Sequence, residues 1–209
     1  LTVNSSHVDA HYNLGIALKE KGDLVAAIES LKQAIKLKPD YTRAGNALGN
    51  ILREQGDLDA AIDCFLSIVN LTPNYDDAHC NLGNVQSDKG LLDSAIKSYY
   101  QAIELNPKHV MAYYNLGIVM RRQGKLDEAI ENLERALEID PMLVSAHINL
   151  GNTLKDLGKR DLALESYERA LKIDAKNSDA LFNKAIVLQN LGRHREALQI
   201  LAAAKLAYG

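Results

Sequence analysis

Apolar side chains recur at intervals of three and four residues along nearly the whole chain, in short stripes separated by polar turns. This spacing places the apolar side chains of one stripe on one face of an α-helix. It therefore predicts pairs of amphipathic helices joined by short turns. In residues 110–143 the two stripes consist of Tyr113, Leu116, Gly117 and Met120, and of Leu126, Ala129, Ile130, Leu133, Ala136 and Leu137.

Glycine and proline mark the ends of these predicted helices. Gly124 stands between the two stripes, where a residue in the left-handed conformation ends a helix, and Pro141 follows the second stripe, where it stops a helix. Gly117 and Ala129 fall on facing sides, so their small size lets the two helix axes approach to roughly 8 Å. We expect an antiparallel hairpin that a larger residue at either place forces apart.

The hairpin repeats every 34 residues. Self-similarity at a fixed period is the signature of a repeat protein. The residues that share this interval are Gly22, Gly56, Gly90, Gly124, Gly158 and Gly192; Gly15, Gly49, Gly83, Gly117 and Gly151; Pro39, Pro73, Pro107 and Pro141; and Ala27, Ala61, Ala95, Ala129, Ala163 and Ala197. We expect an all-α solenoid of six tandem helix-turn-helix repeats that forms a single domain.

The predicted repeats begin at Val8 and occupy residues 8–41, 42–75, 76–109, 110–143, 144–177 and 178–209. Leu1–His7 matches the end of a second helix in this register, so we interpret residues 1–7 as the tail of a preceding repeat. We therefore expect the natural protein to be longer on at least one side.

Composition narrows the class of protein. The 209 residues are 47% hydrophobic, 24% charged and 5% aromatic, with a formal net charge of −3. We find neither a membrane span nor a signal-peptide pattern, and no basic run offers a nucleic-acid surface. The two cysteines cannot build a disulfide framework. We expect a cytoplasmic or nuclear protein that binds neither membrane nor nucleic acid.

The repeated motif resembles the tetratricopeptide repeat. An Asn-Leu-Gly motif at 13–15, 81–83, 115–117 and 149–151 is followed by the turn glycine, an alanine five residues later, a bulky apolar residue, a second alanine and a proline. The resemblance covers essentially the whole chain. It implies a right-handed superhelix whose concave groove is lined mainly by the first helix of each pair.

The chain departs from the family pattern at two places. The family's frequent tryptophan, four residues into the unit, is replaced in turn by His11, Gly45, His79, Tyr113, His147 and Leu181. The last unit has Lys184 where the others have leucine, and Ala175 where a proline precedes the others. Such departures are expected of a terminal repeat.

Asparagine is concentrated on the face that the resemblance assigns to the groove. The sixth position of the units, interrupted by Ala47, and the ninth position together hold Asn13, Asn81, Asn115, Asn149 and Asn183, and Asn50, Asn84 and Asn152. Asparagine disfavours helix interiors, whereas its amide complements a peptide group. We expect these amides to hold an extended peptide, and the alternative is that they bond within the repeats. The column also resembles that of the O-linked N-acetylglucosamine transferases.

Aromatic, apolar and basic residues complete the predicted peptide-binding groove. They are Tyr12, Tyr114, Ile118 and Phe182, with Arg121 and Arg122. The first four anchor a peptide or pack against the neighbouring repeat. The arginines form an unopposed pair that favours an acidic or phosphorylated segment, or else a solvated helix end. The basic residues of chaperone-binding repeats, which clamp a terminal carboxylate, are missing from these positions.

Histidine and cysteine do not gather as metal binding or covalent catalysis requires. His11, His79 and His147 lie in alternate units, roughly 20 Å apart if neighbouring first helices are about 10 Å apart. Cys64 and Cys80 lack a histidine partner in the pattern, so we interpret both as structural thiols. We expect no cofactor, no metal and no catalytic residue.

The sequence therefore predicts a protein–protein interaction scaffold rather than an enzyme, which binds an extended peptide or a partner helix in its groove. Two alternatives stay open. The chain is the substrate-recognition region of a larger enzyme, such as a glycosyltransferase, or its repeats assemble with copies of themselves through the repeat ends or the groove.

Overall fold

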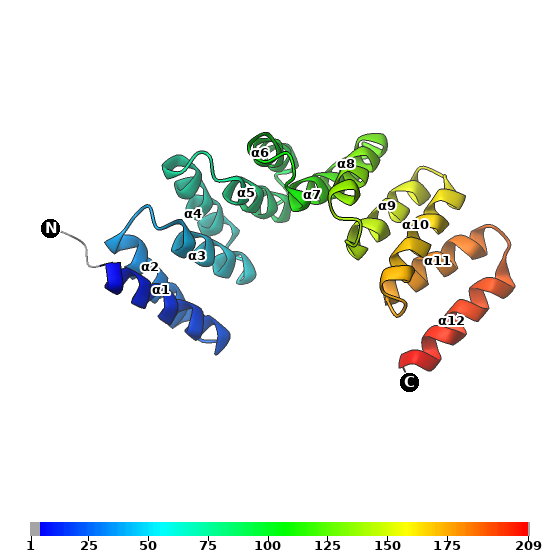
Figure 1. Cartoon of the computed structure of the whole chain (residues 1–209), viewed down its shortest axis with the longest axis horizontal. Coiled ribbons are helices and arrows are strands. Elements are labelled where there is room, and N and C mark those ends of the chain that lie inside the picture. The colour runs from blue at the N-terminus through cyan, green and yellow to red at the C-terminus, as the bar shows by residue number, and fades with distance from the viewer. Residues whose placement is uncertain (1–4, 209) are drawn as a thin grey trace. The chain divides into compact units, whose positions relative to one another are not determined.

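The computed structural model describes residues 5–208, and within them it contains twelve α-helices and no strand (Figure 1). The helices alternate between the first and second members of successive hairpins. Their bounds are α1 Ser5–Glu20, α2 Leu24–Leu37, α3 Thr42–Glu54, α4 Leu58–Leu71, α5 Asp76–Asp88, α6 Leu92–Leu105, α7 Val110–Arg122, α8 Leu126–Ile139, α9 Val144–Asp156, α10 Arg160–Ile173, α11 Ser178–Asn190 and α12 His194–Tyr208.

Five of the six first helices begin where the repeat register places them. The starting residues are Thr42, Asp76, Val110, Val144 and Ser178. The first helix differs, because α1 already begins at Ser5. Ser5–His7, which the repeat register places in the predicted tail, is therefore helical and continuous with the rest of α1. Residues 1–4 of the predicted tail lie outside the described residues.

A glycine in the left-handed region ends each first helix, as predicted. The six turn glycines have φ between 76° and 83°. After α1, the Gly22 amide donates to Lys19 O at 2.9 Å and the Asp23 amide donates to Leu18 O at 2.9 Å, which satisfies the last carbonyls of the helix. A Cβ on Gly22 meets nothing within 4 Å. The backbone conformation, and not crowding, therefore requires glycine at this turn.

The second series of glycines permits close packing inside the first five hairpins. A Cβ on Gly117 would lie 2.7 Å from Leu133 Cγ and 3.1 Å from the carbonyl oxygen of Ala129. A Cβ on Gly151 would lie 2.5 Å from Cε1 of Tyr167. Ala129 itself is completely buried. These contacts confirm that small residues let the two helices of a hairpin approach.

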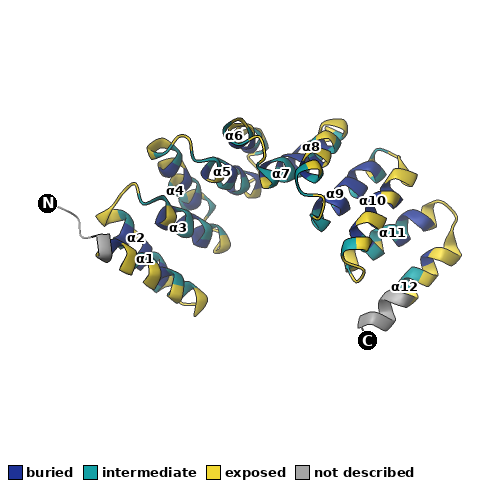
Figure 2. Cartoon of the chain, viewed as in Figure 1, coloured by how far each residue is buried: buried dark blue, intermediate teal, exposed yellow. Residues whose placement is uncertain are grey.

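Close contacts divide the chain into two compact units, Leu1–Pro107 and Lys108–Gly209. Within each unit, second helices also pack against the first helices that follow them: α2 on α3 and α4 on α5 in one unit, and α8 on α9 and α10 on α11 in the other. Buried residues line the facing sides of these helices (Figure 2). Each unit is thus a stack of three hairpins around its own apolar core, and the single domain over 1–209 stays a prediction.

Replacing Ala129 by Leu is expected to lower the free energy of unfolding by about 1–3 kcal/mol, because the added side chain overpacks the hairpin. Urea unfolding followed by circular dichroism measures the change. The matched control is Glu131→Leu, at an exposed position of the same helix, which is expected to change stability by less than about 0.5 kcal/mol. Equal effects of the two substitutions would show that the hairpin tolerates the extra volume.

Candidate functional site

The predicted groove residues all lie on first helices, and none of them is fully buried. Asn13, Arg122 and Phe182 are exposed, and the remaining members are half-buried. In chain order, α1 holds Tyr12 and Asn13, α3 holds Asn50, α5 holds Asn81 and Asn84, α7 holds Tyr114, Asn115, Ile118, Arg121 and Arg122, α9 holds Asn149 and Asn152, and α11 holds Phe182 and Asn183.

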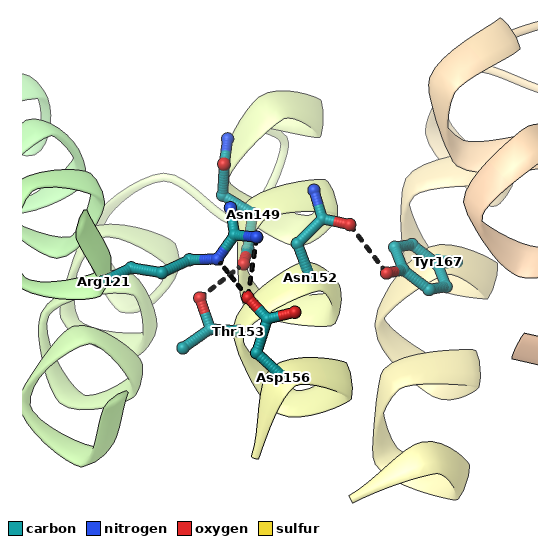
Figure 3. A network of polar contacts seen from close by, with 6 residues as sticks. All are labelled: Arg121, Asn149, Asn152, Thr153, Asp156 and Tyr167. Atoms are coloured by element: carbon teal, nitrogen blue, oxygen red, sulfur yellow. Dashed lines mark hydrogen bonds and ion pairs between the residues drawn. The ribbon is translucent and has the colours of Figure 1, made fainter. Parts of the chain in front are cut away.

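Two ninth-position asparagines accept hydrogen bonds from tyrosines of their own hairpin. The Tyr167 hydroxyl donates to Asn152 Oδ1 at 2.8 Å (Figure 3), and the Tyr99 hydroxyl donates to Asn84 Oδ1 at 3.0 Å. Both tyrosines are almost completely buried. A buried hydroxyl needs a partner, so the amide oxygen has a structural role in these repeats. Burial also raises the pKa of Tyr167, which keeps the phenol neutral.

The sequence contains a signal for this pairing, which appears only when two positions of the unit are compared. The ninth residue of a unit is Asn wherever the residue fifteen places later is aromatic, and Ile wherever that residue is Leu. The pairs are Asn50 with Phe65, Asn84 with Tyr99 and Asn152 with Tyr167, and Ile16 with Leu31, Ile118 with Leu133 and Ile186 with Leu201. The residue types at these two positions vary together, because the two side chains meet across the hairpin.

Sixth-position asparagines reach the fifth position of the preceding repeat. Asn149 Nδ2 donates to the Tyr114 hydroxyl at 3.1 Å and to the carbonyl of Ser145 at 2.9 Å. Asn81 Nδ2 approaches Asn46 Oδ1 at 3.5 Å, a weak contact. These bonds fix the orientation of the Asn149 amide. Within the described residues its Oδ1 has no protein partner.

The aromatic side chains of the predicted site differ in how far they are available. The ring of Tyr12 packs edge-on against Tyr41 with centroids 5.7 Å apart, and the Arg43 guanidinium lies 4.9 Å from the Tyr12 centroid. Tyr12 thus joins two repeats. Tyr114 accepts from Asn149, whereas Phe182 is 59% exposed.

The prediction of an unopposed Arg121–Arg122 pair is wrong for Arg121. Its guanidinium donates to Asp156 Oδ2 at 2.7 Å (Figure 3), from the twelfth position of one repeat to the thirteenth of the next. Lys19 pairs with Glu54 at 2.7 Å in the same register. Arg121 and Asp156 lie on separate helices, and stacking of the repeats brings their charges together.

Histidines at the fourth position link neighbouring repeats. A ring nitrogen of His79 lies 2.8 Å from Pro73 O, and one of His147 lies 2.9 Å from Pro141 O. Each histidine side chain therefore links its helix to the proline turn that precedes it. Among the described residues, no three His, Cys, Asp or Glu side chains are grouped to hold a metal.

The cysteines differ from reactive thiols in their surroundings. Burial raises the pKa of the Cys64 thiol to about 11, so it is protonated at neutral pH. Its Sγ donates to Gly45 O at 3.3 Å. Cys80 is 3% exposed. Burial of the two side chains supports the structural interpretation.

Models of the tetratricopeptide repeat match residues 8–41, residues 49–90, residues 74–142 together with 110–176, and residues 166–199. The chain belongs to the tetratricopeptide repeat family. The matches span both compact units, and the helix-turn-helix order is the one that the sequence predicts. No curated protein sequence matches the chain.

Solved structures of similar fold agree with this assignment. The chain is 28% identical to the MamA protein, with a TM-score of 0.71 over 83% of this chain and 95% of that one. It is 25% identical to YrrB, described as a TPR protein with an unusual peptide-binding site, with a TM-score of 0.66 over 85% and 92%. PilF of Pseudomonas aeruginosa has a TM-score of 0.82 over 98% and 93% at 18% identity, which shows the fold alone.

One further property concerns the length and polarity of the helices. Over the part of the chain that the structure describes, no helix has both the length and the apolar composition to cross a membrane.

Replacing Asn152 by Ile is expected to cost about 1–3 kcal/mol of stability, because the buried Tyr167 hydroxyl loses its partner. Adding Tyr167→Phe is expected to restore most of the loss, since the hydroxyl is then gone. A double-mutant cycle measured by urea unfolding gives the coupling. Asn50→Ile is the control, because Asn50 faces Phe65 and no hydroxyl is left without a partner. Strictly additive single changes would show that the hydrogen bond contributes nothing.

Proposed function

We propose that this tetratricopeptide repeat protein is a non-catalytic interaction module that holds an extended peptide by its backbone on the first-helix faces. The proposal rests on how the two polar ends of the asparagine amides are used. On α9, each of the two asparagine amides uses one end to bond the protein, and the other end is left for a ligand.

Asn149 and Asn152 of α9 show this division most clearly. Asn149 uses its Nδ2 group within the protein and Asn152 uses its Oδ1 atom. Residues three apart are neighbours on a helix surface, and Figure 3 shows both amides on the same side of α9. One acceptor, Asn149 Oδ1, and one donor, Asn152 Nδ2, therefore stand next to each other. A peptide backbone offers the complementary N–H and C=O.

The other unit offers similar groups on its first helices. Asn13 of α1 is exposed and Asn50 of α3 is half-buried. Neither side chain hydrogen-bonds to another described residue. Repeated amides of this kind favour a ligand read through its backbone, which gives affinity with little dependence on ligand side chains.

Two further observations shape the ligand. Phe182 is 59% exposed on α11 and offers an apolar anchor for one ligand side chain. Arg121 is neutralised by Asp156, so an acidic segment gains less there than the sequence suggested. The description of YrrB, which names a peptide-binding site in a similar fold, supports a peptide ligand for this chain.

Asn152→Asp is the sharpest test of this function, because the carboxylate still accepts from Tyr167 but no longer donates to a ligand. Peptides selected from a random displayed library on the purified chain serve as probes. The substitution is expected to weaken their binding roughly tenfold, measured by calorimetry, with the unfolding midpoint almost unchanged. Asn70→Asp, at an exposed position of α4, is the charge-matched control and is expected to bind normally.

A second measurement addresses backbone recognition directly. Replacing one peptide bond of the selected ligand by an ester removes a backbone N–H, and it is expected to lower affinity by a similar factor when that N–H faces Asn149. If Asn152→Asp and the ester series leave affinity unchanged, the amides are structural and the proposed peptide face is wrong.

A further inference from the structure

A pocket of about 440 Å³ lies in the second repeat, between α2 and α4 and over α3. Its apolar wall includes Ile35, Leu48, Leu52, Ile68 and Leu71. This volume is within the range of small-molecule sites in proteins. Its lining contains none of the asparagines of the predicted groove, so it does not rest on the proposed peptide binding.

The pocket arises from a local exchange of side chains. The fourth position of repeats 3, 4 and 5 holds His79, Tyr113 and His147, whereas repeat 2 holds Gly45. Where repeats 1, 3, 4 and 5 have a completely buried alanine on the second helix, repeat 2 has Ile68. A Cβ on Gly45 would lie 2.9 Å from Ile68 Cδ1. Ile68 therefore fills part of the space that a ring occupies elsewhere, and the pocket is the remainder.

The corresponding surface of repeat 5 shows the effect of the ring. A pocket of about 570 Å³ there is lined by His147 and Leu150 together with charged residues of α8 and α10. Among its described lining residues it does not include Leu154, whose counterpart Leu52 lines the pocket of repeat 2. The absence of a ring at position 45 thus opens the deep, apolar part of the surface.

One backbone acceptor beside the pocket lacks the histidine donor that two of its counterparts have. The carbonyls of Pro73 and Pro141 each meet a histidine ring nitrogen of the following repeat. Pro39 lines the pocket of repeat 2, where Gly45 offers no ring. Within the described residues no group donates to Pro39 O. A ring that enters the pocket and presents an N–H donor replaces the missing interaction.

The charge at the mouth of the pocket selects among such rings. Asp40, Asp57 and Asp63 line it and are exposed, against the single cation of Lys32. The Asp57 side chain also accepts from the Ala60 amide at 3.3 Å, which keeps it in place. An excess of carboxylates favours a cationic ligand over an anionic one.

We propose that this pocket binds a small aromatic amine of the size and chemistry of tryptamine. The ring lies against Gly45 and the apolar wall, its N–H donates to Pro39 O, and its ammonium group lies among the carboxylates at the mouth. The site takes the place of the side chain that repeat 2 lacks.

Tryptamine fluorescence tests the proposal without interference, because the chain contains no tryptophan and the indole can be excited where tyrosine does not absorb. Titration of the full chain is expected to saturate along a one-site binding curve, with a dissociation constant of about 0.1–1 mM for a ligand of this size. Indole-3-acetate, which has the same ring with a negative charge, is expected to bind at least fivefold more weakly.

The double substitution Gly45→His with Ile68→Ala rebuilds the combination found in repeats 3 and 5, and so closes the deep, apolar part of the pocket while keeping a packing the fold already uses. It is expected to weaken tryptamine binding at least tenfold. Asp63→Lys, at an exposed position, leaves the core untouched and is expected to weaken binding roughly fivefold. Val25→His, on the exposed side of α2, is the matched control and is expected to bind normally.

Three results would overturn the proposal. They are a linear, unsaturated titration, equal affinity in the wild-type chain and both pocket variants, and tighter binding of indole-3-acetate than of tryptamine. Tighter binding of N-acetyltryptophanamide, a neutral indole in a peptide context, would also overturn it, because the occupant would then be a tryptophan of a protein partner.

Discussion

The close approach of the two helices in each hairpin is the constraint on which the rest of the structure depends. Glycine on the first helix leaves room for the second helix to lie against its backbone, and a Leu, Phe or Tyr side chain occupies the space where a Cβ would stand. Side-chain volume at this contact is therefore tightly constrained, since protein interiors are packed as densely as crystals. The same contact recurs in successive repeats, so a single local geometry sets the spacing of the whole stack within each unit.

This contact also explains the asparagines of the ninth position. When the second helix contributes a tyrosine, as in Tyr99 and Tyr167, the phenol passes beneath the first helix and its hydroxyl meets an amide there. Burial of that hydroxyl is tolerated because the amide oxygen accepts its hydrogen bond. Part of the asparagine face is thus a consequence of core packing. The groups that remain, such as Asn149 Oδ1, are the ones that a ligand can use.

The second repeat shows how one exception is accommodated. Repeat 2 has no ring at Gly45. The side chain of Ile68 covers this space only in part, and a pocket remains. Other repeats use the ring of His79 or His147 to bond the carbonyl of the preceding proline turn. A repeat protein tolerates such a local defect because each repeat contacts only its neighbours. The result is a cavity of distinct chemistry in an otherwise regular stack.

The sequence by itself determined the number, length and order of the helices, because their signals are local. Period, turn glycines such as Gly124 and small residues such as Ala129 act within one hairpin, where helix geometry dictates which side chains face each other. The partners of Asn149, Arg121 and Asn152 were decided only by the tertiary structure, since each partner stands on another helix. Whether these side chains meet depends on how the helices cross and stack. The sequence does not contain the distances between side chains of different helices. The pairing of Asn152 with Tyr167 was visible in the sequence only as a covariation, whose cause is the packing between helices.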